Sequence, residues 1–219
     1  MSPFDAVDVP RAPRLGPLTA VSREDLAVDR DWYDVSIEHD LGGSDLCELN
    51  MQCARCVMSQ FVGADMQRAR LIDVAFEGCD LSGALLEDSS LTRVEFRNCR
   101  LSGGQFNASR LNDVRFIGCR MDGACLRMVH GERLWFEDCV LTEAEFYAAE
   151  LAGARLVGCD LAGADFSQAR IPDAHLVGSN VSDLRGVGGL QRPVIDPTQV
   201  TPFALSLLTL HGVVVQEAT

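Results

Sequence analysis

Apolar residues recur every five positions along most of this chain. From Leu46 to Val181, almost every fifth residue is Leu, Phe, Met, Ile, Val or Cys. Two residues before most of these positions stands a small or β-branched residue, such as Ala69, Val74 or Cys79. Neither the helical period of about 3.6 nor the strand period of roughly 2 gives this pattern. A fixed period of this kind predicts a repeat architecture.

A second period of 20 residues accompanies the first. The chain reads VAFEGCDL at 74–81, VEFRNCRL at 94–101 and VRFIGCRM at 114–121. Units such as CDLSGALLED, AELAGARLVG and CDLAGADFSQ resemble the pentapeptide-repeat proteins, whose motif is roughly A-(D/N)-L-x-x. The resemblance covers residues 44–185. It implies an all-β solenoid, a right-handed quadrilateral β-helix of about seven 20-residue coils, in which four five-residue sides make one coil.

Residues 20 apart would then stack on one side, with backbones about 4.8 Å apart. One expected stack consists of phenylalanines: Phe76, Phe96, Phe116 and Phe136. Another consists of cysteines flanked by Ser59 and Ser179: Cys79, Cys99, Cys119, Cys139 and Cys159. Parallel stacked thiols lack the dihedral that a disulfide needs, so we expect small buried hydrophobes. An outer column of alternating charge predicts a surface ion ladder: Asp73, Arg93, Asp113 and Arg133.

One repeat departs from the pattern at Gly131, where Leu is expected. The nearby inward positions hold Val129 and Leu134, which are larger than usual. We expect these side chains to fill the volume that glycine vacates, because protein cores keep close packing. The alternative is a local kink that exposes His130 and Trp135 for binding.

Both ends of a solenoid need caps, because open coils expose unpaired backbone edges. We expect three parts: residues 1–43 form a tail and cap, 44–185 the β-helix, and 186–219 a linker, a helix and a possible dimerisation segment. Residues 1–18 hold four prolines and are expected to be mobile. SRED at 22–25 predicts a capping box, and RDWYDVSIEHDL at 30–41 predicts a strand over the first coil.

The C-terminal segment TPFALSLLTLHG predicts a helix with Thr201 as N-cap, Pro202 in the first turn and Gly212 at the stop. The predicted helix is apolar on nearly every side, so it must be covered by more than the last coil. We therefore expect a homodimer in which a second copy covers the helix. The expected interface residues are Phe203, Leu205, Leu207, Leu208 and Leu210.

The net charge is −13, from 32 acidic and 19 basic residues. Such a chain is not expected to bind nucleic acid or anionic lipid through its overall field. The charge is uneven, since residues 91–135 hold 4 acids and 8 bases whereas 136–185 hold 9 acids and 3 bases. The arginines of the central belt are Arg93, Arg97, Arg100, Arg110, Arg115 and Arg120.

The sequence holds few candidate residues for a catalytic or metal site. The four histidines do not meet at a 20-residue spacing, and no glycine-rich phosphate loop is present. CARC at 53–56, with Cys47 upstream, is the single metal-like spacing, but no second ligand pair is near it. We therefore predict no enzyme activity, cofactor or metal. An odd cysteine count without a secretion signal indicates free thiols in a reducing cytoplasm.

The resemblance leaves two main functions open, and an enzyme, redox or metal protein that uses Cys47, Cys53 and Cys56 is the least favoured. One is a DNA mimic that binds DNA gyrase, a type II topoisomerase, as do pentapeptide-repeat proteins that protect gyrase from quinolones. The tail VIDPTQVTPFALSLLTLHGVVV resembles the C-terminal segment of a member of that group. The other is a generic protein-interaction scaffold with an unknown partner. For the DNA mimic, the candidate binding residues are Glu137, Asp138, Glu143, Glu145, Glu150, Asp160 and Asp165.

Overall fold

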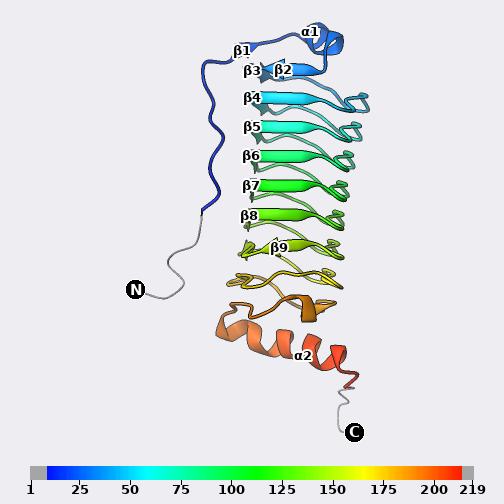
Figure 1. The fold of residues 1–219 in the computed structure, drawn as a ribbon. Helices are drawn as coiled ribbons and strands as arrows, with labels where there is room; N and C mark the ends of the chain where they lie inside the picture. Colours follow the sequence, from blue (N-terminus) through cyan, green and yellow to red (C-terminus); the bar gives the residue numbers. More distant parts are fainter. Residues whose placement is uncertain (1–8, 214–219) are drawn as a thin grey trace.

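The chain forms a rod of stacked coils with a helix at the C-terminal end (Figure 1). A computed structural model describes residues 9–213. The coils are a parallel β-solenoid of about seven turns, as the resemblance to the pentapeptide-repeat proteins implies. Five long strands and several short ones build them. Their bounds are β1 Thr19–Ala20, β2 Asp31–Tyr33, β3 Val35–Ile37, β4 Asn50–Val57, β5 Arg70–Glu77, β6 Ser90–Arg97, β7 Arg110–Ile117, β8 His130–Glu137, β9 Glu150–Ala152 and β10 Arg155–Val157.

Each long strand covers two sides of its coil and turns a corner at its fourth residue. The corner residues, such as Asp73 and Arg93, have left-handed backbone with φ of 56° and 53°. The strands pair in parallel at a constant offset of 20 residues, so that Leu71 lies opposite Leu91 and Phe76 opposite Phe96. The other two sides are joined by isolated parallel bridges at the same offset, for example Asp80 with Arg100. Side chains 20 apart therefore form straight columns along the rod.

The inside of the rod is filled by the five-residue apolar series. Phe76, Phe96 and Phe116 stack with ring centroids 4.8 and 4.9 Å apart and ring planes within 4° of each other. Phe106 meets Phe116 edge to face, at 6.0 Å and 87°. This confirms the predicted aromatic ladder, in which every coil buries the coils above and below it.

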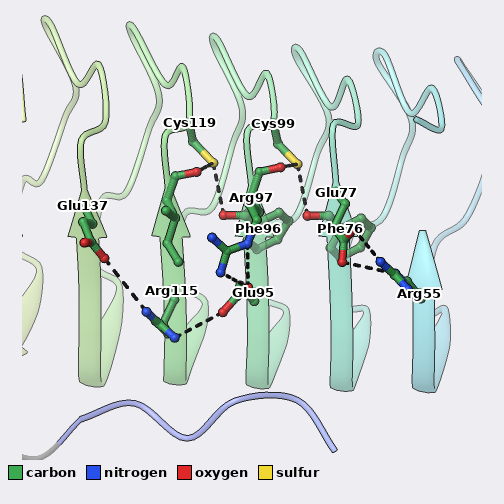
Figure 2. Close-up of polar contacts among 11 residues, drawn as sticks. Arg55, Phe76, Glu77, Glu95, Phe96, Arg97, Cys99, Arg115, Cys119 and Glu137 are labelled. Atoms are coloured by element: carbon green, nitrogen blue, oxygen red, sulfur yellow. Dashed lines mark hydrogen bonds and ion pairs between the residues drawn. The ribbon is translucent and has the colours of Figure 1, made fainter. Parts of the chain in front are cut away.

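The cysteine column is buried, and each thiol also donates a hydrogen bond. Cys99 Sγ lies 3.4 Å from the carbonyl oxygen of Phe76, and Cys119 Sγ lies 3.3 Å from that of Phe96 (Figure 2). Ser59 and Ser179 at the ends of the column donate in the same way, to the carbonyls of Ile37 and Leu156. All nine cysteines are free thiols. The thiols are therefore polar linkers between coils as well as small core residues.

Gly131 causes no kink. β8 keeps the register of its neighbours, with Leu111 opposite Gly131 and Phe116 opposite Phe136. A Cβ on Gly131 would lie 2.7 Å from Leu151 Cδ2 and 3.4 Å from Leu134 Cδ2. The packing prediction is confirmed for Leu134 but not for Val129, because the closest atom belongs to Leu151 of the next coil.

The N-terminal cap follows the prediction. Helix α1 (Arg23–Val28) begins at a capping box between Ser22 and Asp25. β2 and β3 both pair with β4, and the chain turns between them at Asp34. Trp32 and Ile37 point into the core, so this segment closes the first coil.

Residues 9–18 are ordered against the rod, which makes the prediction of a mobile tail wrong for this segment. They run along its side from β1 toward the middle coils (Figure 1). The N–H of Arg14 donates to Asp73 Oδ1 at 2.9 Å, and the N–H of Arg11 donates to Asp113 Oδ1 at 3.1 Å. Pro10 is buried. The part of the tail at residues 1–8 lies outside the described residues.

The C-terminal end begins its helix earlier than predicted. A 3-10 turn at Pro197–Gln199 starts at a capping box between Asp196 and Gln199, and it leads directly into helix α2 (Val200–Leu210). Thr201 is therefore not the N-cap, because Asp196 already satisfies the free N–H groups one turn earlier. The chain ends the helix at Gly212, with φ of 70°, as predicted. A second 3-10 turn at Val187–Gly189 contacts α2.

Candidate partner-binding surfaces

The outer surface is best described by four columns, one on each side of the rod. We define each side by the residues that parallel β-pairing places in one column along the rod. Side 1 carries Asn50, Arg70, Ser90, Arg110, His130, Glu150 and Arg170. Side 2 carries Arg55, Ala75, Glu95, Arg115, Trp135, Arg155 and His175. Side 3 carries Asp40, Gln60, Asp80, Arg100, Arg120, Val140, Asp160 and Asn180. Side 4 carries Asp45, Asp65, Leu85, Gln105, Cys125, Glu145, Asp165 and Arg185.

The seven acidic residues predicted as a binding site do not form one patch. Glu145 and Asp165 are neighbours on side 4. Asp160 lies on side 3 and Glu150 on side 1, while Glu137 lies on side 2 opposite Val157. Asp138 and Glu143 are exposed at corners with left-handed backbone. The acids of the C-terminal half are therefore spread over all four sides, and sides 1 and 2 also carry Arg170 and Arg155 there.

Several of these carboxylates already lie beside basic side chains of the chain. Glu145 lies 3.0 Å from Arg127, and Asp165 lies 4.0 Å from Arg185. The other pairs are Glu137 with Arg115 at 3.9 Å and Glu150 with His130 at 3.4 Å. Asp160 accepts hydrogen bonds from the Asn180 side chain and the Ala162 N–H. Asp138 and Glu143 have no ion-pair partner among residues 9–213.

The arginines of the central belt also lie on different sides of the rod, and most of them form ion pairs with carboxylates. Arg97 and Arg115 both contact Glu95, at 2.7 and 3.3 Å (Figure 2). Arg100 contacts Asp80 and Arg120 contacts Asp122. The exception is Arg110, which is exposed and has no ion-pair partner within the described part of the chain. The belt is therefore close to neutral, although the sequence there carries an excess of bases.

Side 2 contains a stack of planar groups that inspection of the sequence alone missed. The Arg115 and Arg155 guanidinium groups lie over Trp135, at 5.7 and 5.0 Å from its ring centroid. Trp135 Nε1 and the Nε atoms of both arginines are buried and have no hydrogen-bond partner in the range 9–213. The 20-residue register is the signal that would have found the stack, since 115, 135 and 155 fall in one column. A bound carbonyl, carboxylate or water would satisfy these N–H groups.

The alternating-charge column is a pair of partly buried ion pairs rather than a surface ladder. Arg93 donates two hydrogen bonds to the Asp73 carboxylate, at 2.6 and 2.7 Å. Arg133 donates two to the Asp113 carboxylate, at 2.6 and 3.0 Å. Asp73 and Asp113 are only 7% and 3% exposed. The prediction of a surface ladder fails because residues 9–18 lie over these carboxylates. The Arg93 guanidinium and the Arg14 N–H hold the pKa of Asp73 below its ordinary value, and Arg133 and the Arg11 N–H do the same for Asp113.

Helix α2 divides the predicted dimer residues into two groups. Phe203 is buried in the chain's own core, so it is not part of the exposed face. The other four are exposed, by 47, 37, 39 and 50%: Leu205, Leu207, Leu208 and Leu210. The end of the rod therefore exposes apolar side chains of α2 to solvent. Monomeric proteins in water rarely expose a large apolar patch.

The three cysteines considered for a metal or redox role lie in three different environments. Cys56 points into the core, where burial raises its thiol pKa. Burial, followed by the nearby Asp34 charge, raises the pKa of Cys53. Cys47 accepts a hydrogen bond from Arg68. Within residues 9–213, no three His, Cys, Asp or Glu side chains are placed to hold a metal ion.

The cavities are open surface grooves. A groove of about 510 Å³ lies on side 1 and is lined by residues that include Arg110, His130, Glu150 and Arg170. A groove of about 380 Å³ separates α2 from the last coil beside Asp183 and Arg185. No helix in the described range is long and apolar enough to cross a membrane.

Comparison with known proteins matches the repeat region. The sequence matches the pentapeptide repeat region family at residues 49–124 and 89–156, and eight copies of the pentapeptide repeat at 144–183. No curated protein sequence matches the chain.

Two solved structures show the same architecture. Two trypsin-treated variants of QnrB1, a plasmid-mediated fluoroquinolone resistance protein, each match with a TM-score of 0.51 and 26% identity, over 86% of this chain and 94% of theirs. A pentapeptide repeat protein from the thylakoid lumen of Arabidopsis thaliana is 25% identical over 39% of this chain and 60% of its own, with a TM-score of 0.30.

Proposed function

Because this chain belongs to the pentapeptide-repeat family, we propose that it is a non-enzymatic binding protein whose partner is DNA gyrase, a type II topoisomerase. The observation that carries the proposal is the likeness to QnrB1, a fluoroquinolone resistance protein, over 86% of this chain. Pentapeptide-repeat proteins that protect gyrase from quinolones do so by resembling DNA. The proposal locates the protein in the cytoplasm, where a reducing environment keeps its nine thiols free.

The mechanism is competition for the DNA-binding groove of the enzyme. Duplex DNA carries one charge per about 1.7 Å, hence roughly three charges in the 4.8 Å rise of one coil. Residues 136–185 hold 9 acids and 3 bases over about two and a half coils, a net charge of about two per coil, which is below the density of duplex DNA. These acids surround the rod, as phosphates surround a duplex. The C-terminal half is the section whose charge fits the proposal best.

The homodimer belongs to this proposal. Two copies joined through the exposed leucines of α2 would place their acidic C-terminal halves end to end. The centre of such a dimer would carry about −12 on two copies of residues 136–185, because each copy has 9 acids and 3 bases there. A basic groove would then meet an acidic surface longer than that of one copy.

Binding to purified gyrase with charge-reversed variants tests the proposed surface. We expect Glu145→Arg with Asp165→Arg to weaken binding at least tenfold, because the two carboxylates are neighbours in the acidic half. The matched control is Asp45→Arg with Asp65→Arg, a neighbouring pair in the same column near the other end of the rod. The proposed surface is wrong if both pairs have the same effect. The proposed partner is wrong if the unmodified protein does not bind.

A protein-interaction scaffold that uses side 2 is the second candidate function. It is favoured by the Arg115–Trp135–Arg155 stack, whose buried N–H groups have no partner in residues 9–213. An acidic partner would pair with the half-buried guanidinium groups of Arg115 and Arg155. Trp135→Ala would weaken binding to a partner captured through this side and leave gyrase binding unchanged.

A further inference from the structure

The N-terminal segment 9–18, VPRAPRLGPL, lies over one corner of the rod, between sides 1 and 2. We call this segment the arm. We call the corner residues Asp73, Arg93, Asp113 and Arg133 beneath it the corner strip. The arm contacts the strip through main-chain donors, since its Arg11 and Arg14 side chains are exposed. The repeat fold of the rod does not require such a contact.

The spacing of the arm matches the spacing of the strip. Arg11 and Arg14 are three residues apart, and a polyproline II segment advances about 9.3 Å in three residues while returning to the same face. Asp73 and Asp113 are 40 residues apart in the sequence, which is two coils or about 9.6 Å along the rod. One turn of such a segment therefore spans two coils and meets a carboxylate at each end.

The composition of the arm suits this conformation. Pro10, Pro13 and Pro17 fix an extended backbone, and none of them occupies a position that must donate. Both donors directly follow a proline, as Pro10–Arg11 and Pro13–Arg14. The N–H of Ala12, between them, donates to no residue in the range 9–213. The donors therefore recur with a period of three.

The two carboxylates of the corner strip accept these N–H donors. In each ion pair one carboxylate oxygen, Oδ1, accepts both the arginine Nε–H and the arm N–H. Alternation of Asp and Arg separates the two carboxylates by two coils and supplies an arginine to hold each one in place. A column of aspartates alone would place like charges about 4.8 Å apart.

We propose that the corner strip is a binding site for an extended, proline-containing peptide, and that the chain's own arm occupies it as a reversible strap. Two main-chain hydrogen bonds to charged acceptors and one buried proline hold the arm in place. A peptide with donors three residues apart, each after a proline, replaces the arm when the arm is released. This inference is independent of the gyrase proposal, since it concerns a different part of the rod.

The test uses the full-length chain with Arg11→Pro and Arg14→Pro, which removes both donors and keeps the arm extended. The probe is a labelled synthetic peptide with the sequence of residues 9–18, followed by fluorescence anisotropy. We expect the peptide to bind this variant with one-to-one stoichiometry and at least tenfold more tightly than the unmodified protein. Full-length Ala12→Pro is the matched control, and we expect it to behave as the unmodified protein does.

Altered peptides give a readout that does not depend on the folding of a variant. A peptide carrying R11P and R14P should not bind the released protein, whereas a peptide carrying A12P should bind as the natural sequence does. The proposal is overturned if the natural peptide does not bind the released protein, or if all three peptides bind alike. Unprotected hydrogen exchange at the Arg11 and Arg14 N–H groups of the unmodified protein would also overturn it, because these two donors would then not hold the arm.

Discussion

Single polar side chains in this rod satisfy main-chain groups that the repeat leaves unpaired. Cys119 and Ser179 lie in one column and donate to carbonyls of the preceding coil, at 3.3 and 2.7 Å. Asp73 and Asp113 use one carboxylate to hold an arginine and an amide of the arm together. The second arrangement carries charge, so it makes stability depend on pH.

The ion pairs of the corner strip should stabilise the fold above about pH 4 and lose that effect in more acidic solution. The carboxyl pKa values of Asp73 and Asp113 are lower in the folded chain than the ordinary value of 3.8. The stabilisation is therefore present above pH 3.8 and is lost as the pH falls through the lower folded values. We expect Asp73→Asn with Asp113→Asn to flatten the fall of Tm below about pH 4, measured by circular dichroism.

Asp88→Asn with Asp138→Asn is the matched control. Both residues have the left-handed backbone of the corner aspartates, but they are exposed and have no ion-pair partner among residues 9–213. Their variant should keep the pH profile of the unmodified protein. Equal profiles for the two double variants would contradict this account of the strip.

At the scale of elements, the sequence predicts the coils well because each coil touches mainly its neighbours. The periods of 5 and 20 residues identify the inward positions, and even Gly131 stays in register in β8. The start of α2 is less predictable, since Thr201–Pro202 and Asp196–Pro197 are both acceptable caps. Contacts with the last coil favour the earlier start, where the Gln199 side chain donates to the carbonyls of Leu176 and Ser179.

The packing around Gly131 makes a coupled prediction. Gly131→Leu should lower the free energy of unfolding by about 1–3 kcal/mol, because Leu151 and Leu134 already fill that space. Leu134→Val, which restores the residue found at 74, 94 and 114, should recover part of the loss, because Leu151 remains the closer neighbour. Urea denaturation of both single variants and the double variant measures the coupling. Additive losses would mean that Leu134 does not compensate for the glycine.

At the scale of the whole molecule, the sequence predicted the rod but not how its charges are arranged. Counting charges along the chain gives an acidic half and a basic belt. Residues 20 apart share a column, and in these columns the acids fall on all four sides. Most arginines of the belt form ion pairs with nearby carboxylates. The arm was not predicted, because ten residues without a hydrophobic period give no sign of what they lie against.

The exposed leucines of α2 predict a dimer that charged substitutions dissociate. Leu205→Glu with Leu208→Glu should convert the dimer to a monomer in size-exclusion chromatography with light scattering, because a buried charge opposes association. Val62→Glu on the rod is the control, since Val62 is exposed to a similar degree, 43% against 39% for Leu208. A chain that is monomeric at every concentration tested would rule out the proposed dimer.

The most direct test of the central proposal is a titration of the purified protein into a DNA gyrase supercoiling assay, with and without a fluoroquinolone. We predict that the protein inhibits supercoiling or protects the enzyme from the drug at micromolar dimer or below. We also expect Glu145→Arg with Asp165→Arg to reduce the effect more than Asp45→Arg with Asp65→Arg. No effect at many-fold excess over gyrase would contradict the proposal, and the partner would then have to be sought among proteins that recognise another side of the rod.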